Sequence, residues 1–165
     1  MTAFFGANLS SLGSMTAAEL VAGGKGFAVG DTYVDGAGNG YTFIVAGGAI
    51  TGAGFVVRFG TDYSATMLST SNDARGDRVG VALGAIASGE YAWVQTSGIF
   101  ANVQVLASCA ANARLNTTAT AGALDDDGTA GSMAIDHIVL TTARAASQGN
   151  APGIAANNAA VGAVL

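Results

Sequence analysis

Hydrophobic residues alternate with polar or small ones over much of the chain, and glycine clusters separate the alternating runs. YTFIVA at 41–46 places Tyr41, Phe43 and Val45 on one face, and FVVRF at 55–59 alternates in the same way. Side chains in a strand point to opposite faces in turn, so a period of two between glycine clusters is typical of half-buried strands.

The most regular pattern lies between residues 79 and 106. VGVALGAIA at 79–87, YAWVQT at 91–96 and IFANVQVL at 99–106 are separated by Ser88-Gly89 and Ser97-Gly98. Two-residue links of a polar residue and glycine favour tight antiparallel hairpins. The sequence therefore predicts a three-stranded meander with YAWVQT in the middle.

The middle strand of this meander carries the single tryptophan of the chain. Tyr91 and Trp93 lie two residues apart, so we expect them on one face, where neighbouring strands on both sides allow large aromatic side chains to be buried. We interpret Tyr91 and Trp93 as core aromatics. The alternative is that they form a stacking surface for a ligand.

The two ends of the chain differ from its centre. Ser14 precedes MTAAELVAGG, which predicts a short helix that begins after a serine N-cap, ends at glycine and packs through Met15, Leu20 and Val21. The C-terminal residues have no period and no charge, which indicates an extended arm. We therefore expect three parts: an N-terminal arm with a short helix (1–24), a β-rich domain (25–146) and a C-terminal extended arm (147–165).

Further strands are expected before and after the meander. FAVGDTYV at 27–34 and the segment around 135–142 have strand patterns, and the polar stretch 61–77 resembles a long loop with one irregular strand. Together these elements predict an all-β fold, an antiparallel β-barrel or sandwich of about eight strands with a short N-terminal helix and extended terminal arms.

Composition adds a preference for self-association. The 165 residues suffice for one domain with a core, and 50% are hydrophobic, but only 10% are charged, against roughly 25% in an average soluble domain. Such a surface suits burial against other subunits. The net charge is −5 and the six basic residues are scattered, so we expect no nucleic-acid partner, since affinity for nucleic acid needs several cations on phosphates.

The sequence also bears on the cellular compartment in which the protein is found. One cysteine cannot form an internal disulfide framework, and the first residues show no secretory signal pattern. No apolar run has the length of about 18 residues that a membrane span needs. We therefore expect no membrane partner and assembly in a cytoplasm.

Several short motifs invite chemical interpretations. GKGFAVG at 24–30 has the wrong glycine spacing for a dinucleotide site and no following helix, so no cofactor is predicted. Asp125, Asp126 and Asp127 could help to hold Ca²⁺, but adjacent carboxylates lack the alternating spacing of a calcium loop. We interpret them as a solvated turn and predict no metal site.

A catalytic interpretation would use Cys109 as nucleophile, His137 as base and Asp136 as orienting group. Asp136 and His137 are neighbours whose side chains diverge on a strand, and no GxSxG motif accompanies any serine. We therefore predict no catalytic residues and no enzymatic activity. The Arg-Gly-Asp tripeptide at 75–77 is interpreted as a coincidence in a polar loop.

The order of these segments resembles small capsid decoration (cement) proteins of tailed bacteriophages. The resemblance covers roughly residues 28–142 and depends most on GEYAWVQ at 89–95, with DGAGNGYTFIVAGGAI at 35–50, LNTTATAGALDDDGTAGS at 115–132 and IDHIVLTT at 135–142. It implies a virion structural protein, usually a homotrimer, that binds the outer surface of the head, contacts the major capsid protein and needs no cofactor.

Two expectations complete this interpretation. Phe4 and Phe5 are apolar residues on the N-terminal arm, and we expect them to be the first contacts with the capsid or with another subunit. The alternative function is a carbohydrate-binding β-sandwich module on a virion or cell surface, with Tyr91 and Trp93 stacking on a glycan.

Overall fold

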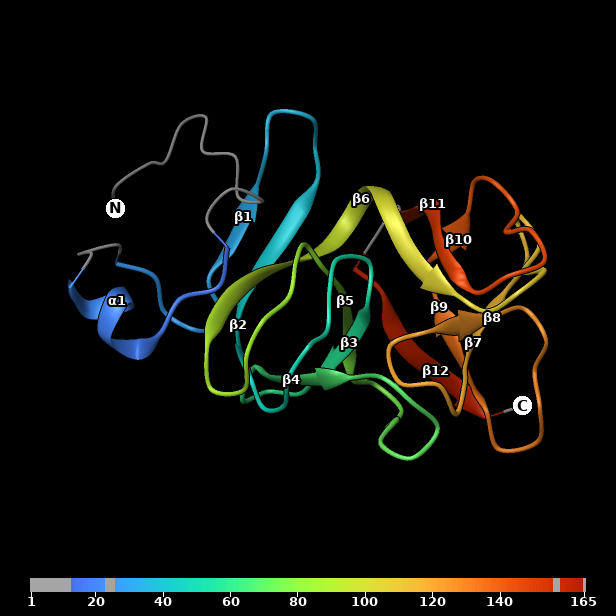
Figure 1. Cartoon of the computed structure of the whole chain (residues 1–165), viewed down its shortest axis with the longest axis horizontal. Coiled ribbons are helices and arrows are strands. Elements are labelled where there is room, and N and C mark those ends of the chain that lie inside the picture. Colours follow the sequence, from blue (N-terminus) through green and yellow to red (C-terminus); the bar gives the residue numbers. More distant parts are fainter. Residues whose placement is uncertain (1–12, 23–25, 156–157, 165) are drawn as a thin grey trace.

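The computed structural model describes residues 13–22, 26–155 and 158–164. Within them the chain forms a short helix and twelve strands that belong to a single hydrogen-bonded sheet (Figure 1). The all-β class is confirmed, with twelve strands in the described ranges where about eight were expected. The elements are α1 (Ala17–Ala22), β1 (Thr32–Val34), β2 (Gly40–Ala46), β3 (Val56–Phe59), β4 (Ser64–Met67), β5 (Arg78–Ala82), β6 (Tyr91–Val105), β7 (Leu115–Thr117), β8 (Leu124–Asp125), β9 (Met133–Asp136), β10 (Val139–Leu140), β11 (Gly149–Ala155) and β12 (Ala160–Val164).

Helix α1 begins two residues later than the sequence pattern suggests. Thr16, not Ser14, caps it: the Glu19 amide donates to Thr16 Oγ1 at 3.2 Å, and the Thr16 amide donates to Glu19 Oε2 at 2.8 Å. This reciprocal pair is a capping box, which satisfies two amide donors at a helix N-terminus. Of the three expected packing residues, Met15 is buried and Leu20 packs beside it, while the side chain of Val21 lies outside the described part.

Strand β6 is the longest element, and it replaces the second hairpin of the predicted meander. Ser97-Gly98 does not turn the chain, so YAWVQT and IFANVQV form one strand of 15 residues. The pairing with β2 shifts register here, because Gly40 is opposite Ser97 but Tyr41 is opposite Gln95. Gly98 has φ = 93° and lies against Asn39. A glycine with positive φ at a register shift is typical of a β-bulge.

Five strands close a first ring. β2 pairs with β4, β4 with β3, β3 with β5, β5 with β6, and β6 returns to β2. The β2–β4 pairing is parallel and is an exception to the predicted antiparallel arrangement. The ring encloses one hydrophobic core, whose largest members include Ile44, Ile50, Val57 and Phe59.

A second ring shares two of these strands. β5 pairs with β12, β12 with β9, β9 with β7, β7 with β8, and β8 with β6, again in parallel at the last step. Its core contains Phe100, Leu115, Leu124, Ile135 and Val161 among others. The two barrel-like halves lie side by side along the long axis of the molecule, with α1, β1 and β2 at one end and β7–β10 at the other (Figure 1).

Strand β5 separates the two cores, and its sequence RVGVA reflects this position. Val79 and Val81 point into the second core, whereas Ala82 belongs to the first. Gly80 lies over Val94 of β6, where a Cβ atom would be only 2.8 Å from Val94 Cγ2. A strand with both faces buried reads as a continuous apolar run, and glycine allows the close approach.

The C-terminal residues belong to the sheet, and the predicted extended arm over 147–165 is wrong for the strands that they contain. β11 pairs with β6 over Gly149–Ala155, and β12 pairs with β9 and β5. Ala151, Ala155, Ala159 and Val161 are buried in the second core. Alanine and glycine fit there because larger neighbours already fill the space, so this segment shows little hydrophobic periodicity.

Candidate functional site

The predicted core aromatics lie in a third cluster on the outer face of β2 and β6. Trp93 is 5% exposed and is opposite Phe43 in register, with ring centroids 5.2 Å apart. Phe27 packs edge-on against Trp93 at 5.3 Å, and Tyr91 is stacked on Phe43 at 6.2 Å. The pattern of the sequence placed Tyr91 and Trp93 on one face correctly but gave no sign that Phe27 would join them.

A short N-terminal segment covers this aromatic cluster. Met15 forms an isolated antiparallel bridge to Tyr91, in which each backbone amide donates to the carbonyl of the other residue at 2.7–2.8 Å. Met15 is buried, and Tyr91 and Leu20 are half-buried beside it. A sugar that stacks on an aromatic ring needs an open ring face. Trp93 does not offer one, because its side chain is buried by these neighbours.

The indole nitrogen of Trp93 is buried and has no hydrogen-bond partner in the described part of the chain. Trp93 also lines a cavity of about 30 Å³, together with Ser14 and the 83–86 loop. This volume is close to that of one water molecule and is far below that of a sugar ring. The cavity is thus too small for an organic ligand.

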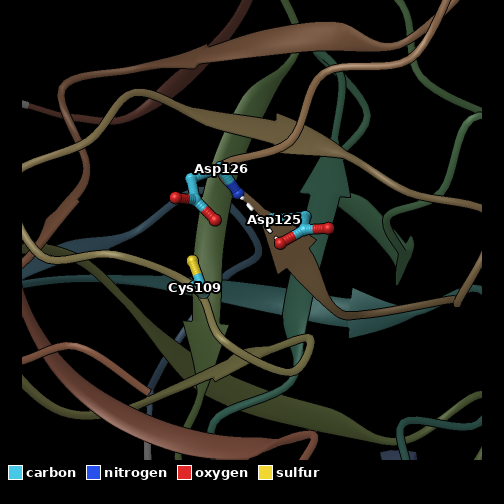
Figure 2. Close-up of side chains that lie close together, drawn as sticks. All are labelled: Cys109, Asp125 and Asp126. Carbon is cyan, nitrogen blue, oxygen red and sulfur yellow. Dashed lines mark hydrogen bonds between the residues drawn. The ribbon is translucent and has the colours of Figure 1, made fainter. Parts of the chain in front are cut away.

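Figure 2 shows the second candidate, a cluster of Cys109, Asp125 and Asp126 at the end of β8. The Cys109 sulfur and one carboxylate oxygen from each aspartate lie within 4.8 Å of one another. The Asp126 carboxylate points toward the sulfur and accepts a hydrogen bond from the Ala110 amide at 3.0 Å. The Asp125 carboxylate points to the other side and accepts from the Asp126 amide at 3.0 Å.

The electrostatics of this cluster favour a protonated thiol. Burial, with the negative charge of Asp126 beside it, raises the pKa of Cys109 to about 12. Burial and the charges of Asp126 and Asp127 also raise the pKa of Asp125. A thiolate nucleophile needs the opposite environment, one that lowers the thiol pKa. Cysteine and carboxylate groups at this spacing could ligate a metal, but both carboxylates already accept hydrogen bonds within the chain.

The other chemical candidates lie apart from this cluster or are engaged elsewhere. His137 is exposed in the turn between β9 and β10, where it has φ = 74°, and Asp136 ends β9 with its carboxylate over Gly162. Cys109, in contrast, is fully buried. In the Arg-Gly-Asp tripeptide, Asp77 forms an ion pair with Arg58 at 2.5 Å, so its carboxylate is not free for a receptor.

The β1–β2 turn is organised by one carboxylate. Asp35 accepts hydrogen bonds from the Ala37 and Asn39 amides, from Asn39 Nδ2 and from the Tyr41 hydroxyl, at 2.9–3.1 Å. Burial opposes ionisation of Asp35, but these four donors outweigh it and lower the pKa of the carboxyl group. Burial and the Asp35 charge raise the pKa of Tyr41 to about 12. Asn39 Oδ1 in turn accepts from the Ile99 amide at 2.9 Å, which ties the turn to β6.

A neutral region of the sheet comprises the strands β1, β2, β6, β11 and β10. None of these five strands contains Asp, Glu, Lys or Arg. β2 and then β11 pair with successive parts of the same edge of β6, and β1 and β10 extend them outward. Because β2 and the first half of β6 are largely buried, the exposed part of this region lies on β1, on β6 from Ile99 onward and on β11, with β10 at its border. We call this exposed part the uncharged surface. The expected contacts Phe4 and Phe5 lie outside the described residues.

Comparison with known proteins adds no assignment. A scan of the chain against protein-family models finds no match, and a search of curated proteins finds none either. Within the described residues, no helix has the length and apolar character that would let it cross a membrane.

Proposed function

We propose that the chain is a capsid decoration protein of a tailed bacteriophage. In this role it binds the outer surface of the head after assembly in the host cytoplasm, contacts the major capsid protein and stabilises the capsid lattice as a homotrimer. The proposal combines the resemblance of residues 28–142 to decoration proteins with the properties of the surface and of the candidate sites.

The observation that carries the proposal is the distribution of charge. The chain is acidic, with a net charge of −5, yet five adjacent strands carry no ionic side chain. A protein that stays alone in solution needs charge over its surface to remain apart from its neighbours. A surface of neutral polar and small apolar groups can instead be buried against another protein without leaving charges unpaired.

The candidate sites support a structural role over a catalytic one. The only thiol is buried and protonated, and the aromatic pair packs inside a cluster. Two barrel-like cores sharing β5 and β6 give a rigid body, which suits a protein that must resist deformation of a shell. A homotrimer also gains from multivalency, because three weak contacts with a lattice act together.

Co-sedimentation with capsids tests the proposal. Purified protein is mixed with emptied, expanded heads of the phage that encodes it, and with unexpanded heads as the matched control. We expect saturable binding to expanded heads, at three copies or a multiple of three for each occupied position. No retention on expanded heads, at protein concentrations well above those in an infected cell, would contradict the proposal.

A further inference from the structure

The uncharged surface carries a row of aliphatic side chains across three strands, and two of these side chains are exposed. Ile99 of β6 is directly opposite Ile154 of β11, and Ile154 is directly opposite Val139 of β10. Directly opposed residues point to the same face of a sheet. Ile99 is 67% exposed and Ile154 is 41% exposed, so these two side chains point away from the core.

A second row runs beside the first. Val34 of β1 is opposite Gly40 of β2, and Gly40 is opposite Ser97, two residues before Ile99 on β6. Val34 is 65% exposed. Three of the five large hydrophobic residues that are exposed in the described ranges therefore lie on these neutral strands, the others being Val29 and Val164. Asn39 joins the two rows through its hydrogen bond with the Ile99 amide.

The loop that borders these rows is also free of charge. Residues 47–55 contain no ionic side chain, and the Ala53 carbonyl accepts from Asn150 Nδ2 at 3.4 Å. Gly54 lies against Asn150 and Asn102, which holds the loop close to β6 and β11. The neutral area thus continues past the strands onto the neighbouring loop.

We propose that this surface, centred on Ile99, Ile154 and Val34, docks a second copy of the same chain. The inference rests on the proposed function and deepens it, because it assigns the subunit contact of the oligomer. Two copies of an acidic chain repel each other over most approaches, and the repulsion is weakest where both present a neutral face. Aliphatic side chains in the centre with amide and hydroxyl groups around them are typical of a subunit interface.

Self-association also explains why the surface is open in the single chain. The rows are bounded by β1 and β10, each of which pairs with one strand in the described part of the sheet. Edge strands that remain uncovered favour further pairing, and natural proteins usually protect them with charge or with another element. Neither β1 nor β10 contains a charged residue of its own, and a neighbouring copy of the chain can cover both strands.

Single charge insertions test the inference. Ile99→Asp and Ile154→Asp each place a carboxylate on the surface, and Val164→Asp is the matched control, because Val164 is an aliphatic residue 59% exposed on β12, outside the surface. Sedimentation velocity over a concentration series measures the oligomer, and near-ultraviolet circular dichroism of Trp93 reports whether each variant is folded. The double variant Ile99→Ala/Ile154→Ala serves if a charged variant fails to fold.

We expect the wild-type chain and Val164→Asp to sediment as the same oligomer. Ile99→Asp and Ile154→Asp should weaken association by about tenfold or more, because a charge would be buried unpaired. A wild-type chain that is monomeric at all concentrations, or folded variants that keep the wild-type oligomer, would overturn the inference.

The same variants separate the inference from the function. If Ile99→Asp and Ile154→Asp become monomers and bind expanded heads more weakly, as expected when several contacts no longer act together, both proposals stand. If the wild-type chain oligomerises through this surface but does not bind heads, the decoration role fails and the inference remains. If the variants keep their oligomeric state but lose capsid binding, the surface contacts the capsid and the inference is wrong.

Discussion

Phe43 of β2 and Trp93 of β6 are directly opposite each other, and their rings pack at 5.2 Å on the outer face of the first barrel-like half. Neighbouring residues of the same strands, Ile44 and Val94, point into the barrel core. The sheet therefore buries both of its faces here. Its outer face needs the segment around Met15 and the ring of Phe27 as a cover.

Truncation of this tryptophan should destabilise the fold. Trp93→Ala removes a buried ring from an enclosed cluster, and we expect a loss of about 3–5 kcal/mol in the free energy of unfolding. Trp93→Phe is the control, and it should cost less, because the indole N–H has no partner whose loss would add a penalty. Urea denaturation measures both. A Trp93→Ala variant as stable as the wild type would show that the cluster does not contribute to the core.

The close approach of β5 and β6 makes a second prediction. Gly80→Ala would place a Cβ atom 2.8 Å from Val94 Cγ2, so we expect a loss of about 1–3 kcal/mol from overpacking. Gly84→Ala is the matched control, since a Cβ atom there meets nothing within 4 Å. Adding Val94→Ala to Gly80→Ala should cost less than the sum of the two single changes, as thermal or urea unfolding can measure. Strict additivity would contradict the predicted contact.

The β1–β2 turn should respond to acid. Because hydrogen bonds lower the pKa of Asp35 below its usual value of 3.8, its ionised form stabilises the folded chain above that pH, and this contribution is lost as the pH falls through the lowered pKa. Asp35→Asn should therefore be less stable than the wild type at neutral pH, and the difference should shrink in acid. Urea unfolding of both proteins at several pH values tests this. A difference that does not vary with pH would argue for a purely steric role.

The buried thiol of Cys109 predicts a loss of stability at alkaline pH, whereas Asp35 predicts a loss in acid. The pKa of Cys109 is raised from 9.0 to about 12, so the unfolded chain ionises this group before the folded chain does. The thiol contribution to stability is complete below pH 9 and is lost as the pH rises toward 12. Wild-type protein should lose more stability than Cys109→Ala between about pH 8 and about pH 10.5. Tyr41 also titrates at alkaline pH, but it is present in both proteins and does not affect the comparison. Equal losses of stability in the two proteins would contradict the raised pKa of Cys109.

Local patterns predicted the strands well where an alternating apolar run lies between two glycine clusters. The runs at 41–46 and 55–59 became most of β2 and all of β3, and the alternation that grouped Tyr41 with Phe43 agrees with their common cluster. The pattern failed at Ser97-Gly98, because the same dipeptide fits a tight hairpin and a bulge inside a long strand. The bulge forms here because Asn39, nearly 60 positions away, packs on Gly98 and accepts a hydrogen bond from the Ile99 amide.

The C-terminal strands and the thiol cluster were beyond local prediction for a different reason. Alanine and glycine in β11 and β12 are buried because the second ring closes around them, and a sequence of small residues looks the same in an arm or in a core. Cys109 and Asp126 are 17 positions apart and come together through the β6–β8 pairing. Long-range pairings of this kind leave no periodic signal in either segment.

The central claim is that the chain strengthens a capsid lattice, and the rupture temperature of emptied heads measures this most directly. Heads are heated with and without saturating protein, and the release of capsid subunits is followed by light scattering. We expect the heads that carry the protein to rupture at a higher temperature, with a shift that grows with occupancy and saturates with it. An unchanged rupture temperature on heads that demonstrably carry the protein would contradict the claim.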